Sequence, residues 1–447
     1  MKPVFLKYSL IACGVLFLSL LTSANGHAQQ PVTLTEAIQL TLAHNFDIRI
    51  EEATAEVSQN NNNWGTAGRY PNITLQLNSN NRLSTVDNPA SFINGTFSSL
   101  GGVGTVNVAW NIFSGNRVNI AKARLEELER LSDGNVALVV ENSLQAVILQ
   151  YYTCVLEQER LASLEANLAL SRDRYEYVNN KKELGSGTTF DLLTVESAYL
   201  ADSSALLQQE LSIQAANRRL TQLIGLGPDS LVGPSEALKT DFQRYDLQLL
   251  RSKMFSNNRT LKNQFINLEI LQKDVALARA NQYPAISLNL GSTYNLSRFN
   301  LDGFEPAAGS QLDYYANFSL NFTLYNGGAV KRAIRNSLVN ERVAELGIGQ
   351  MEQSMDYQLI DALALYDTRR KVLEVTELSV VTAQQNLEIA ETKFRNGTLS
   401  SFNYRDVQVA YLAAVLGKTQ ALFNVMDAEI SLLRLTGGIL DMGEVDR

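Results

Sequence analysis

The chain has 447 residues, with 38 basic and 46 acidic side chains and a formal net charge of −8. A net acidic chain without a basic cluster argues against nucleic acid as a partner. The whole sequence has two cysteines and two histidines, so neither a disulfide framework nor a His- or Cys-rich metal site is expected.

Residues 1–28 have the composition of a secretory signal peptide. A positively charged start leads into an apolar run from Ser9 to Leu21, and small residues follow up to Ala28. The run is too short for a comfortable membrane-spanning helix. The residues before Cys13 resemble a lipoprotein cleavage box, but the apolar run continues past Cys13 instead of ending there. We therefore favour cleavage near Ala28, and the sequence leaves the lipidation of Cys13 open.

A long helix and two strands are predicted next. Thr33 and Glu36 have the spacing of a capping box, and a helix is expected from Thr33 to Gly68, where Tyr70-Pro71 ends it. Apolar and polar residues then alternate with a period of two, which predicts strands near residues 71–80 and 103–113. Glycine, serine and asparagine dominate the residues between these strands, which predicts a loop over 80–102.

Residues 116–184 contain no proline and one interior glycine. They are predicted to form a single helix on the order of 100 Å long. In its last third the apolar residues alternate spacings of three and four, as in a coiled-coil seam. After the turn Gly185-Ser186-Gly187, apolar side chains recur every seven residues from Leu192 to Leu220. The sequence therefore predicts a long helix that packs against its own return helix.

The chain also matches itself at an offset of about 212 residues. The matching segments are 69–77 with 282–290, 110–115 with 322–327, 198–200 with 410–412, and 223–225 with 435–437. We therefore predict two copies of one unit, residues 29–235 and residues 236–447. The second copy is expected to contain a helix over 245–281, strands near 284–295 and 314–325, and a long helix over 328–395. A loop over 295–311 and a second return helix complete it.

Four ten-residue strands with one apolar face fit the wall of an outer-membrane β-barrel, apolar toward lipid and polar toward water. Four strands cannot close around a lumen, and open strand edges are costly in lipid. Closure of a barrel therefore requires several chains, and three chains supply twelve strands. Aromatic residues near the helix-proximal strand ends fit the girdle of such a barrel. They are Tyr70, Trp110, Phe113, Tyr283 and Tyr325.

The sequence lacks motifs of catalysis and of cofactor binding. After removal of the signal peptide the chain keeps one histidine, His44, and one cysteine, Cys154, which is expected to be a packed thiol. Paired His or Cys spacings and a phosphate-binding loop are absent. We expect no enzymatic activity, no cofactor and no resident metal.

The repeated order of helix, two strands, long helix, turn and return helix resembles the TolC-type outer-membrane efflux proteins. The Tyr-Pro strand starts, the Phe-Ser-Gly and Tyr-Asn-Gly strand ends and the glycine turns share this resemblance, which covers residues 31–440. It implies a mainly α fold with membrane β-structure. It further implies a homotrimer with a twelve-stranded β-barrel in outer-membrane lipid, continued by a twelve-helix α-barrel in the periplasm. The expected partners are a periplasmic adaptor (membrane fusion protein) and an inner-membrane pump.

The resemblance also indicates which residues carry the function. Gly185, Gly187, Gly397 and Thr398 belong to the two tip turns, where the adaptor is expected to dock. In the family, acidic residues just after the second tip ring the narrowest point of the tunnel. The matching positions in this chain are Asn403 and Asp406.

Two further tip positions leave the nature of the gate open. Asp191 matches a family acidic residue that ties neighbouring hairpins together, although its place three residues after Thr188 equally fits a helix cap. Leu399 stands where the family usually has a basic partner, so the closing salt bridge of the family is in doubt. Apolar contacts through Leu399, Phe402 and Phe394 are the alternative to an acidic gate at Asp406.

Three functional hypotheses remain. The leading one is an outer-membrane channel for the passive export of small molecules. The same conduit could be the outlet of a type I protein secretion system, because cargo choice lies largely in the pump. A third hypothesis is a non-conducting trimeric structural stalk, which conductance measurements would distinguish. The sequence does not identify the cargo, the adaptor or the pump.

Overall fold

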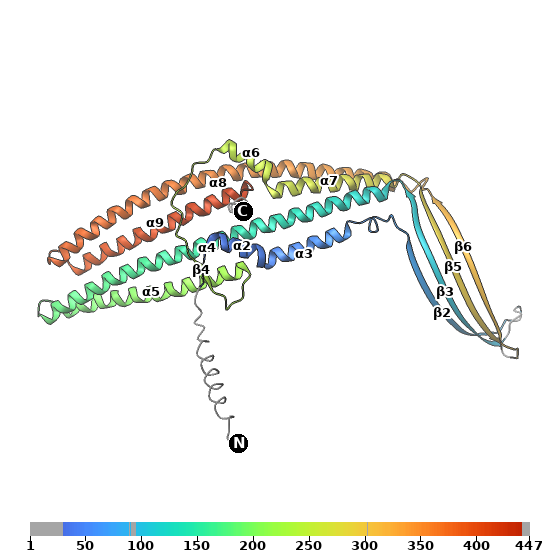
Figure 1. Ribbon diagram of the computed structural model, residues 1–447, viewed down its shortest axis with the longest axis horizontal. Coiled ribbons are helices and arrows are strands. Elements are labelled where there is room, and N and C mark those ends of the chain that lie inside the picture. The colour runs from blue at the N-terminus through green and yellow to red at the C-terminus, as the bar shows by residue number, and fades with distance from the viewer. Residues whose placement is uncertain (1–29, 89, 91–94, 302, 440–447) are drawn as a thin grey trace, which may run out of the picture. The chain divides into compact units, whose positions relative to one another are not determined.

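The computed structural model describes residues 30–88, 90, 95–301 and 303–439 (Figure 1). The predicted signal peptide and Cys13 lie outside the described residues. In space the chain divides into two compact units, and these differ from the two sequence repeats, which we call the first and second copy. The first unit holds the described parts of residues 1–51, 136–259 and 352–447, and the second unit those of residues 52–135 and 260–351. The long helices contribute to both units.

Two helical hairpins dominate the first unit, as the sequence predicts. The first joins α4 (Arg117–Glu183, 67 residues) to α5 (Thr189–Ile224, 36 residues). The second joins α8 (Ala329–Arg395, 67 residues) to α9 (Ser401–Leu435, 35 residues), and in each hairpin the two helices run side by side (Figure 1). The predicted heptad on α5 faces inward, since Leu220 is fully buried, whereas Leu193 and Leu200 of the adjacent stripe are exposed.

The predicted single helices over 33–68 and 245–281 are wrong, because each is interrupted by an asparagine. The structure has α2 (Leu34–His44) and α3 (Phe46–Asn61) in the first copy, and α6 (Leu247–Asn257) and α7 (Arg259–Ala280) in the second. Between them, Asn45 and Asn258 leave the helical backbone conformation, with ψ near 128° and 120°. The capping box of Thr33 and Glu36 at the start of α2 is confirmed.

Each interruption lies against the end of a return helix. The Asn45 side chain accepts hydrogen bonds from the backbone amides of Asp47 and Ile48, and it donates one to the Leu223 carbonyl oxygen at 2.7 Å. In the second copy, Asn258 donates to the Leu435 carbonyl oxygen at 3.0 Å. The last turns of α5 and α9 leave carbonyl groups without helical partners. The asparagines satisfy one such carbonyl in each copy.

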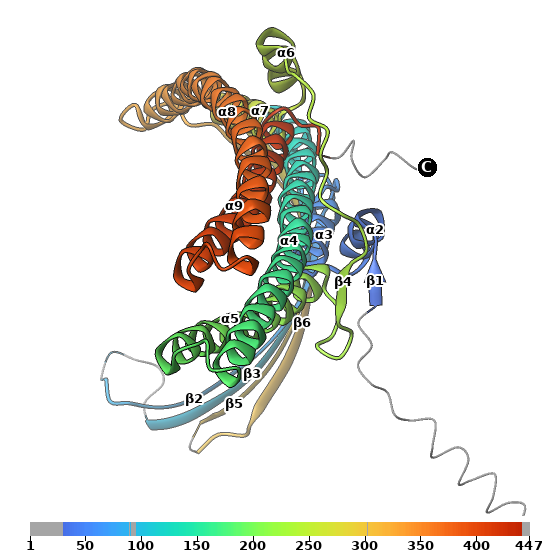
Figure 2. The ribbon, with the colours of Figure 1, turned by 90° about the vertical axis from the view of Figure 1, so that its left-hand side faces the viewer.

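The first unit also contains a small parallel sheet of two strands. Strand β1 (Gln30–Val32) pairs with β4 (Val232–Pro234), and the two lie side by side next to α2 (Figure 2). The buried Tyr151 of α4 donates to the Val32 carbonyl oxygen and accepts from the amides of Ser235 and Glu236. These bonds attach both ends of the first copy to α4.

The second unit contains a four-stranded antiparallel sheet in the order β2-β3-β5-β6. Its strands are β2 (Asn72–Val86), β3 (Gly95–Ser114), β5 (Ala285–Leu301) and β6 (Ala307–Asn321) (Figure 1). The strands continue well beyond their predicted ends near residues 80 and 295, so the predicted loops over 80–102 and 295–311 are wrong for most of their length. Antiparallel pairing continues without a break over these residues, so their backbone N–H and C=O groups are hydrogen-bonded to the neighbouring strands. The small polar side chains that favoured a loop do not prevent this pairing.

Among the helices of the described residues, α9 alone is long and apolar enough by length and composition to cross a bilayer. Its side chains argue for helix packing instead. Val425, Met426 and Ile430 are buried among neighbouring helices, and Glu429 pairs with Lys239 at 3.1 Å.

Candidate functional site

The sheet has one apolar and one polar face, because residues paired across neighbouring strands point to the same side. Starting from Ile73 of β2, the paired rows define what we call the apolar face. It carries the strongly exposed large apolar side chains of the described strands, apart from Ile112, which lies at a register shift. They are Ile73, Leu75, Leu77, Leu83, Leu100, Val106, Trp110, Phe113, Leu290, Tyr294, Leu296, Leu312, Tyr314, Phe318 and Leu320.

The opposite, polar face carries asparagine, glutamine, threonine and serine. One hydrogen bond on it spans three strands: the Tyr315 hydroxyl of β6 donates to Asn107 of β3 at 3.1 Å. The tyrosine side chain passes over Gly291 of β5, where an added Cβ would lie 2.4 Å from the hydroxyl oxygen. Only glycine leaves room for this contact. The sheet therefore separates an apolar surface from a hydrogen-bonding one.

The two helical hairpins end in turns that share one pattern of glycine and backbone hydrogen bonds. Gly185 and Gly397 follow α4 and α8 with φ values of 74° and 73°, in the left-handed region that glycine adopts readily. The next residues, Ser186 and Thr398, donate backbone bonds of 2.9 Å to the carbonyl oxygens of Lys181 and Lys393. This is the Schellman arrangement that closes helix C-termini. The hydroxyls of Ser186 and Thr398 donate to the same two carbonyls.

The return helices begin with side-chain caps. Thr188 accepts a bond from the Asp191 amide at 3.1 Å and donates its hydroxyl to the Asp191 carboxylate at 2.6 Å. Asp191 therefore takes part in the helix cap, one of the two roles that the sequence left open for it. At the second tip, Ser400 accepts from the Asn403 amide at 3.2 Å. An added Cβ at Gly187 would lie 2.9 Å from the Lys182 backbone nitrogen, so this turn is tight.

The predicted gate residues divide into two groups. Phe402, Asn403 and Asp406 are exposed on the first turns of α9, as Asp191 is on α5. Leu399 is half-buried and packs against the aromatic cluster described next. The structure thus places Asn403 and Asp406 one helical turn apart on an open surface, and it separates them from Leu399.

An aromatic cluster joins the two hairpins close to the turns. Phe394 of α8 is buried and stacks on Tyr404 of α9, with ring centroids 4.8 Å apart. It also contacts the Tyr177 ring of α4 at 4.9 Å, and the Tyr177 hydroxyl donates to the Arg395 carbonyl oxygen. Burial raises the pKa of Tyr404, so its hydroxyl stays protonated. The prediction named Phe394 and Leu399 but missed the tyrosines.

Farther from the turns lies a charged cluster that the sequence analysis missed. Arg405 of α9 makes two bonds of 2.6 Å to the Asp202 carboxylate of α5, and Ser171 of α4 donates to the same carboxylate. Arg174, only 2% exposed, donates to Gln408 at 2.9 Å. Burial and the nearby Arg405 charge lower the pKa of Arg174 to about 10. The sequence signal is the polar Ser171 within an otherwise apolar seam.

No group of three or more His, Cys, Asp or Glu side chains suited to a metal ion occurs among the described residues. The features that remain are a two-faced sheet and two paired, exposed helical turns.

Comparison with known proteins identifies the family. A model of the outer membrane efflux protein family matches residues 37–226 and 250–438. The toluene efflux pump outer membrane protein TtgC of Pseudomonas putida is 22% identical over 289 residues, 64% of this chain and 59% of TtgC. Protein CyaE of Bordetella pertussis is 24% identical over 315 residues, 68% of this chain and 63% of CyaE. The chain thus matches about six-tenths of the length of these relatives.

Solved structures show the same fold. The outer membrane protein VceC of Vibrio cholerae superposes with a TM-score of 0.69 at 16% identity, covering 91% of this chain and 96% of VceC. The outer membrane channel CmeC of Campylobacter jejuni gives a TM-score of 0.72 at 14% identity, covering 91% and 85%. With a family model that matches both halves of the sequence, the chain belongs to the outer membrane efflux protein family.

Proposed function

We propose that this chain forms an outer-membrane channel through which small molecules leave the cell passively, driven by a separate pump. Family membership places the chain in the outer membrane, with an extension into the periplasm. The observation that carries the proposal is the sheet, with one face apolar and exposed and the other hydrogen-bonding. Lipid covers the first kind of surface and water the second in a membrane barrel.

Within the described part of the chain, the outer edges of β2 and β6 have no strand partner. Unpaired strand edges are costly in lipid, so the strands of neighbouring chains must pair with these edges. Three chains give a twelve-stranded barrel. The helices support assembly as well, because α8 exposes an apolar stripe that includes Val372, Val375 and Leu378. If the helices of three chains pack into a twelve-helix α-barrel, the contacts between chains cover this stripe.

Small apolar or amphiphilic molecules are the proposed cargo. The relative TtgC is a toluene efflux pump outer membrane protein. A second relative from Pseudomonas putida, ArpC, is an antibiotic efflux pump outer membrane protein and is also 22% identical over 289 residues. A cell that lacks this chain should retain more of a fluorescent amphiphilic dye than a cell that contains it, provided that adaptor and pump are present. Equal dye retention would contradict the proposal for small molecules and leave protein export to be tested.

We assign adaptor docking to the exposed turns, which contain Gly185, Gly187, Gly397 and Thr398. An added Cβ at Gly397 would meet nothing within 4 Å, so the position has space although its φ is positive. Asparagine tolerates this backbone better than most residues. Gly397→Asn should therefore keep the turn intact and, like Thr398→Glu, weaken export without loss of assembly. Normal export by Thr398→Glu and by a charge at Gly185 would place docking elsewhere.

The gate is proposed at the start of α9, and two designs compete. Three copies of Asp406 around a narrow aperture would attract cations, with Asn403 beside them. Leu399 and Phe402 would instead close the aperture by excluding water. An acidic gate predicts cation preference and block by multivalent cations from the periplasmic side, both weakened in Asp406→Asn. If Asp406→Asn changes neither property while Leu399→Ser raises conductance, the gate is apolar. Asp191 is assigned to the helix cap.

A further inference from the structure

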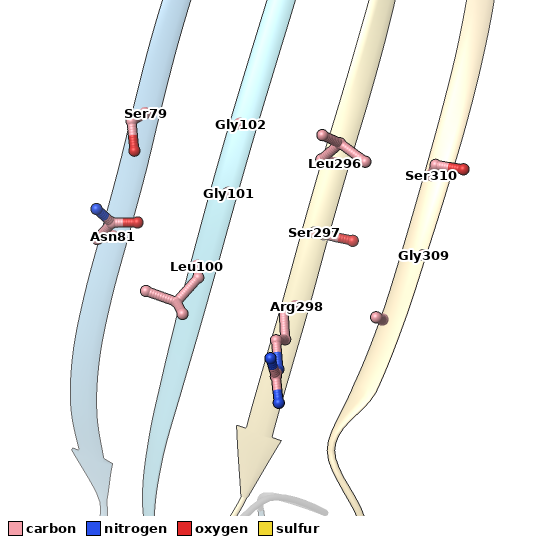
Figure 3. A pocket seen from close by; sticks show the side chains of 11 residues that line it. Ser79, Asn81, Leu100, Gly101, Gly102, Leu296, Ser297, Arg298, Gly309 and Ser310 are labelled. Carbon is pink, nitrogen blue, oxygen red and sulfur yellow. The ribbon is translucent and has the colours of Figure 1, made fainter.

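A shallow hollow of about 640 Å³ lies on the apolar face of the sheet. Figure 3 shows that its side chains come from all four strands. Ser79, Asn81 and Ser310 provide polar groups, and Arg298 of β5 provides a guanidinium. Gly101, Gly102, Ala308 and Gly309 form part of its floor and leave it open.

The register places this hollow at the end of the apolar band. From Ile286 to Leu296, β5 presents mainly apolar residues on this face, over about 33 Å at ~3.3 Å per residue. Tilted as in a membrane barrel, this length matches an apolar band about 25 Å tall. The row of Leu296 contains Ser79 and Ser310, and Arg298 lies in the next row outward. Farther out, apart from Leu83, the face carries serine, threonine and asparagine.

Arg298 is the one charged residue on the apolar face of the described strands, since Arg82 and Asp313 lie on the polar face. Its guanidinium forms no hydrogen bond or ion pair with another described residue. A charge on a lipid-facing surface is costly unless it reaches the interface or a partner. In a membrane barrel, its position just beyond the apolar band would put it at the headgroup level.

We propose that this hollow binds the phosphate-bearing headgroup of an outer-leaflet lipid. A guanidinium binds phosphate oxygens through two parallel hydrogen bonds, and the serine hydroxyls and the asparagine amide add donors. The small residues let a headgroup approach the strands closely. The acyl chains would continue along the adjoining apolar band, next to Leu296 and Tyr294. The inference rests on the proposed membrane barrel, which sets the orientation of the sheet.

Native mass spectrometry of the purified, detergent-solubilised protein tests the site. Phosphatidylglycerol is titrated in, and diacylglycerol with the same acyl chains serves as the ligand without phosphate. We expect phosphatidylglycerol to bind the native chain and Arg298→Gln to bind it about tenfold more weakly. Gly102→Val should also weaken binding by filling the hollow. An added Cβ at Gly102 makes only an ordinary contact of 3.8 Å with Leu296, so the variant should fold.

Arg82→Gln is the matched control. Arg82 lies on the polar face, one row away from Arg298, and it pairs with Ser99, which pairs with Phe299. Its removal should leave phosphatidylglycerol binding unchanged. Equal binding by native protein and Arg298→Gln would overturn the proposal, as would diacylglycerol binding as tightly as phosphatidylglycerol. Inorganic phosphate that binds as tightly as the phospholipid would show a free-anion site and overturn the lipid assignment.

The channel proposal is tested separately in the same preparations. Arg298→Gln should conduct ions in a planar bilayer as the native protein does, because Arg298 faces away from the polar surface. Unchanged lipid binding in a conducting Arg298→Gln protein would refute only the lipid site. Protein that inserts without conducting, in the native form and in the gate variant Leu399→Ser alike, would refute the channel itself.

Discussion

At the residue scale, the charged cluster between the hairpins combines one favourable and one costly interaction. Arg405 and Asp202 form a two-bond ion pair with little exposure. Arg174, buried beside them, has two guanidinium nitrogens without hydrogen-bond partners among the described residues. A buried charge is tolerated only near an opposite charge. Asp202 is the acidic group whose charge favours the protonated Arg174, so the cluster depends on one carboxylate.

The first prediction is that Asp202→Asn strongly destabilises the folded protein. It leaves two guanidinium groups close together without the compensating charge, and breaking a buried pair costs about 3–5 kcal/mol. Thermal unfolding in detergent measures the loss. Glu176→Gln is the control, because Glu176 and Arg172 form an exposed pair within one helix and such pairs contribute little. Similar unfolding temperatures for the two variants would refute the role given to Asp202.

The second prediction concerns Cys154, which is completely buried in α4. Burial raises the pKa of its thiol to about 12, from an ordinary value of 9.0. The folded protein should therefore resist iodoacetamide at pH 8, and denaturant should make the thiol reactive. Between pH 9 and 12 the unfolded chain ionises this thiol first, so the group costs stability as the pH rises. Rapid alkylation of the native protein would contradict its burial.

At the element scale, the first and second copies have the same arrangement where three helix ends meet: those of α2, α3 and α5, and those of α6, α7 and α9. An asparagine interrupts the first helix, and its amide group donates to a carbonyl at the end of the return helix. A glycine in the left-handed region follows that end, Gly225 in one copy and Gly437 in the other. Each approaches the residue before the asparagine closely: an added Cβ would lie 2.3 Å from the His44 oxygen or 2.9 Å from the Asn257 Cβ.

The third prediction is that Gly225→Ala destabilises the protein by more than the backbone conformation alone requires. A left-handed backbone costs a non-glycine residue about 1–2 kcal/mol. The methyl group at Gly225 would also collide with the His44 carbonyl group, whose backbone is hard to move. Gly227→Ala, two residues farther on, meets no atom within 4 Å and is the control. Equal thermal stability of the two variants would show that the joint does not need the close approach.

The long helices and their turns were predictable because their signals are local. A proline-free stretch with a coiled-coil seam and a glycine turn is enough to indicate a helical hairpin. The interruptions at Asn45 and Asn258 were not predictable, since asparagine occurs within ordinary helices and the partner carbonyl comes from a distant segment. The outer parts of the strands were predicted as loops because small polar residues lie on both faces there, and only pairing with neighbours makes them strands.

The candidate site was predictable to a similar extent. The turn glycines and the cap at Thr188 follow from spacing, and the structure has them. The cluster of Arg174, Asp202 and Arg405 was not found, because its members come from three helices and carry no shared motif. The roles given to Asp406, Asn403, Leu399 and Phe402 in gating stay predictions.

At the scale of the whole molecule, the proposed channel needs more than one chain. Its sheet has two open edges, and its helices expose apolar stripes such as Leu193, Leu200 and Leu207 on α5. Both features are costly in a membrane protein that stays monomeric. Light scattering of the detergent-extracted protein, corrected for bound detergent, should give the mass of three chains. A stable, folded monomer in detergent would contradict the barrel.

Single-channel recording in a planar bilayer tests the central claim most directly. Purified protein added to one side should insert and produce uniform steps of current if, as proposed, the polar face of the sheet lines a water-filled path. Arg298→Gln should give the same steps, and Leu399→Ser should give larger ones if the aperture is apolar. Protein that is shown to be inserted but carries no current, in the native form and in the gate variants alike, would identify a structural stalk and contradict the channel.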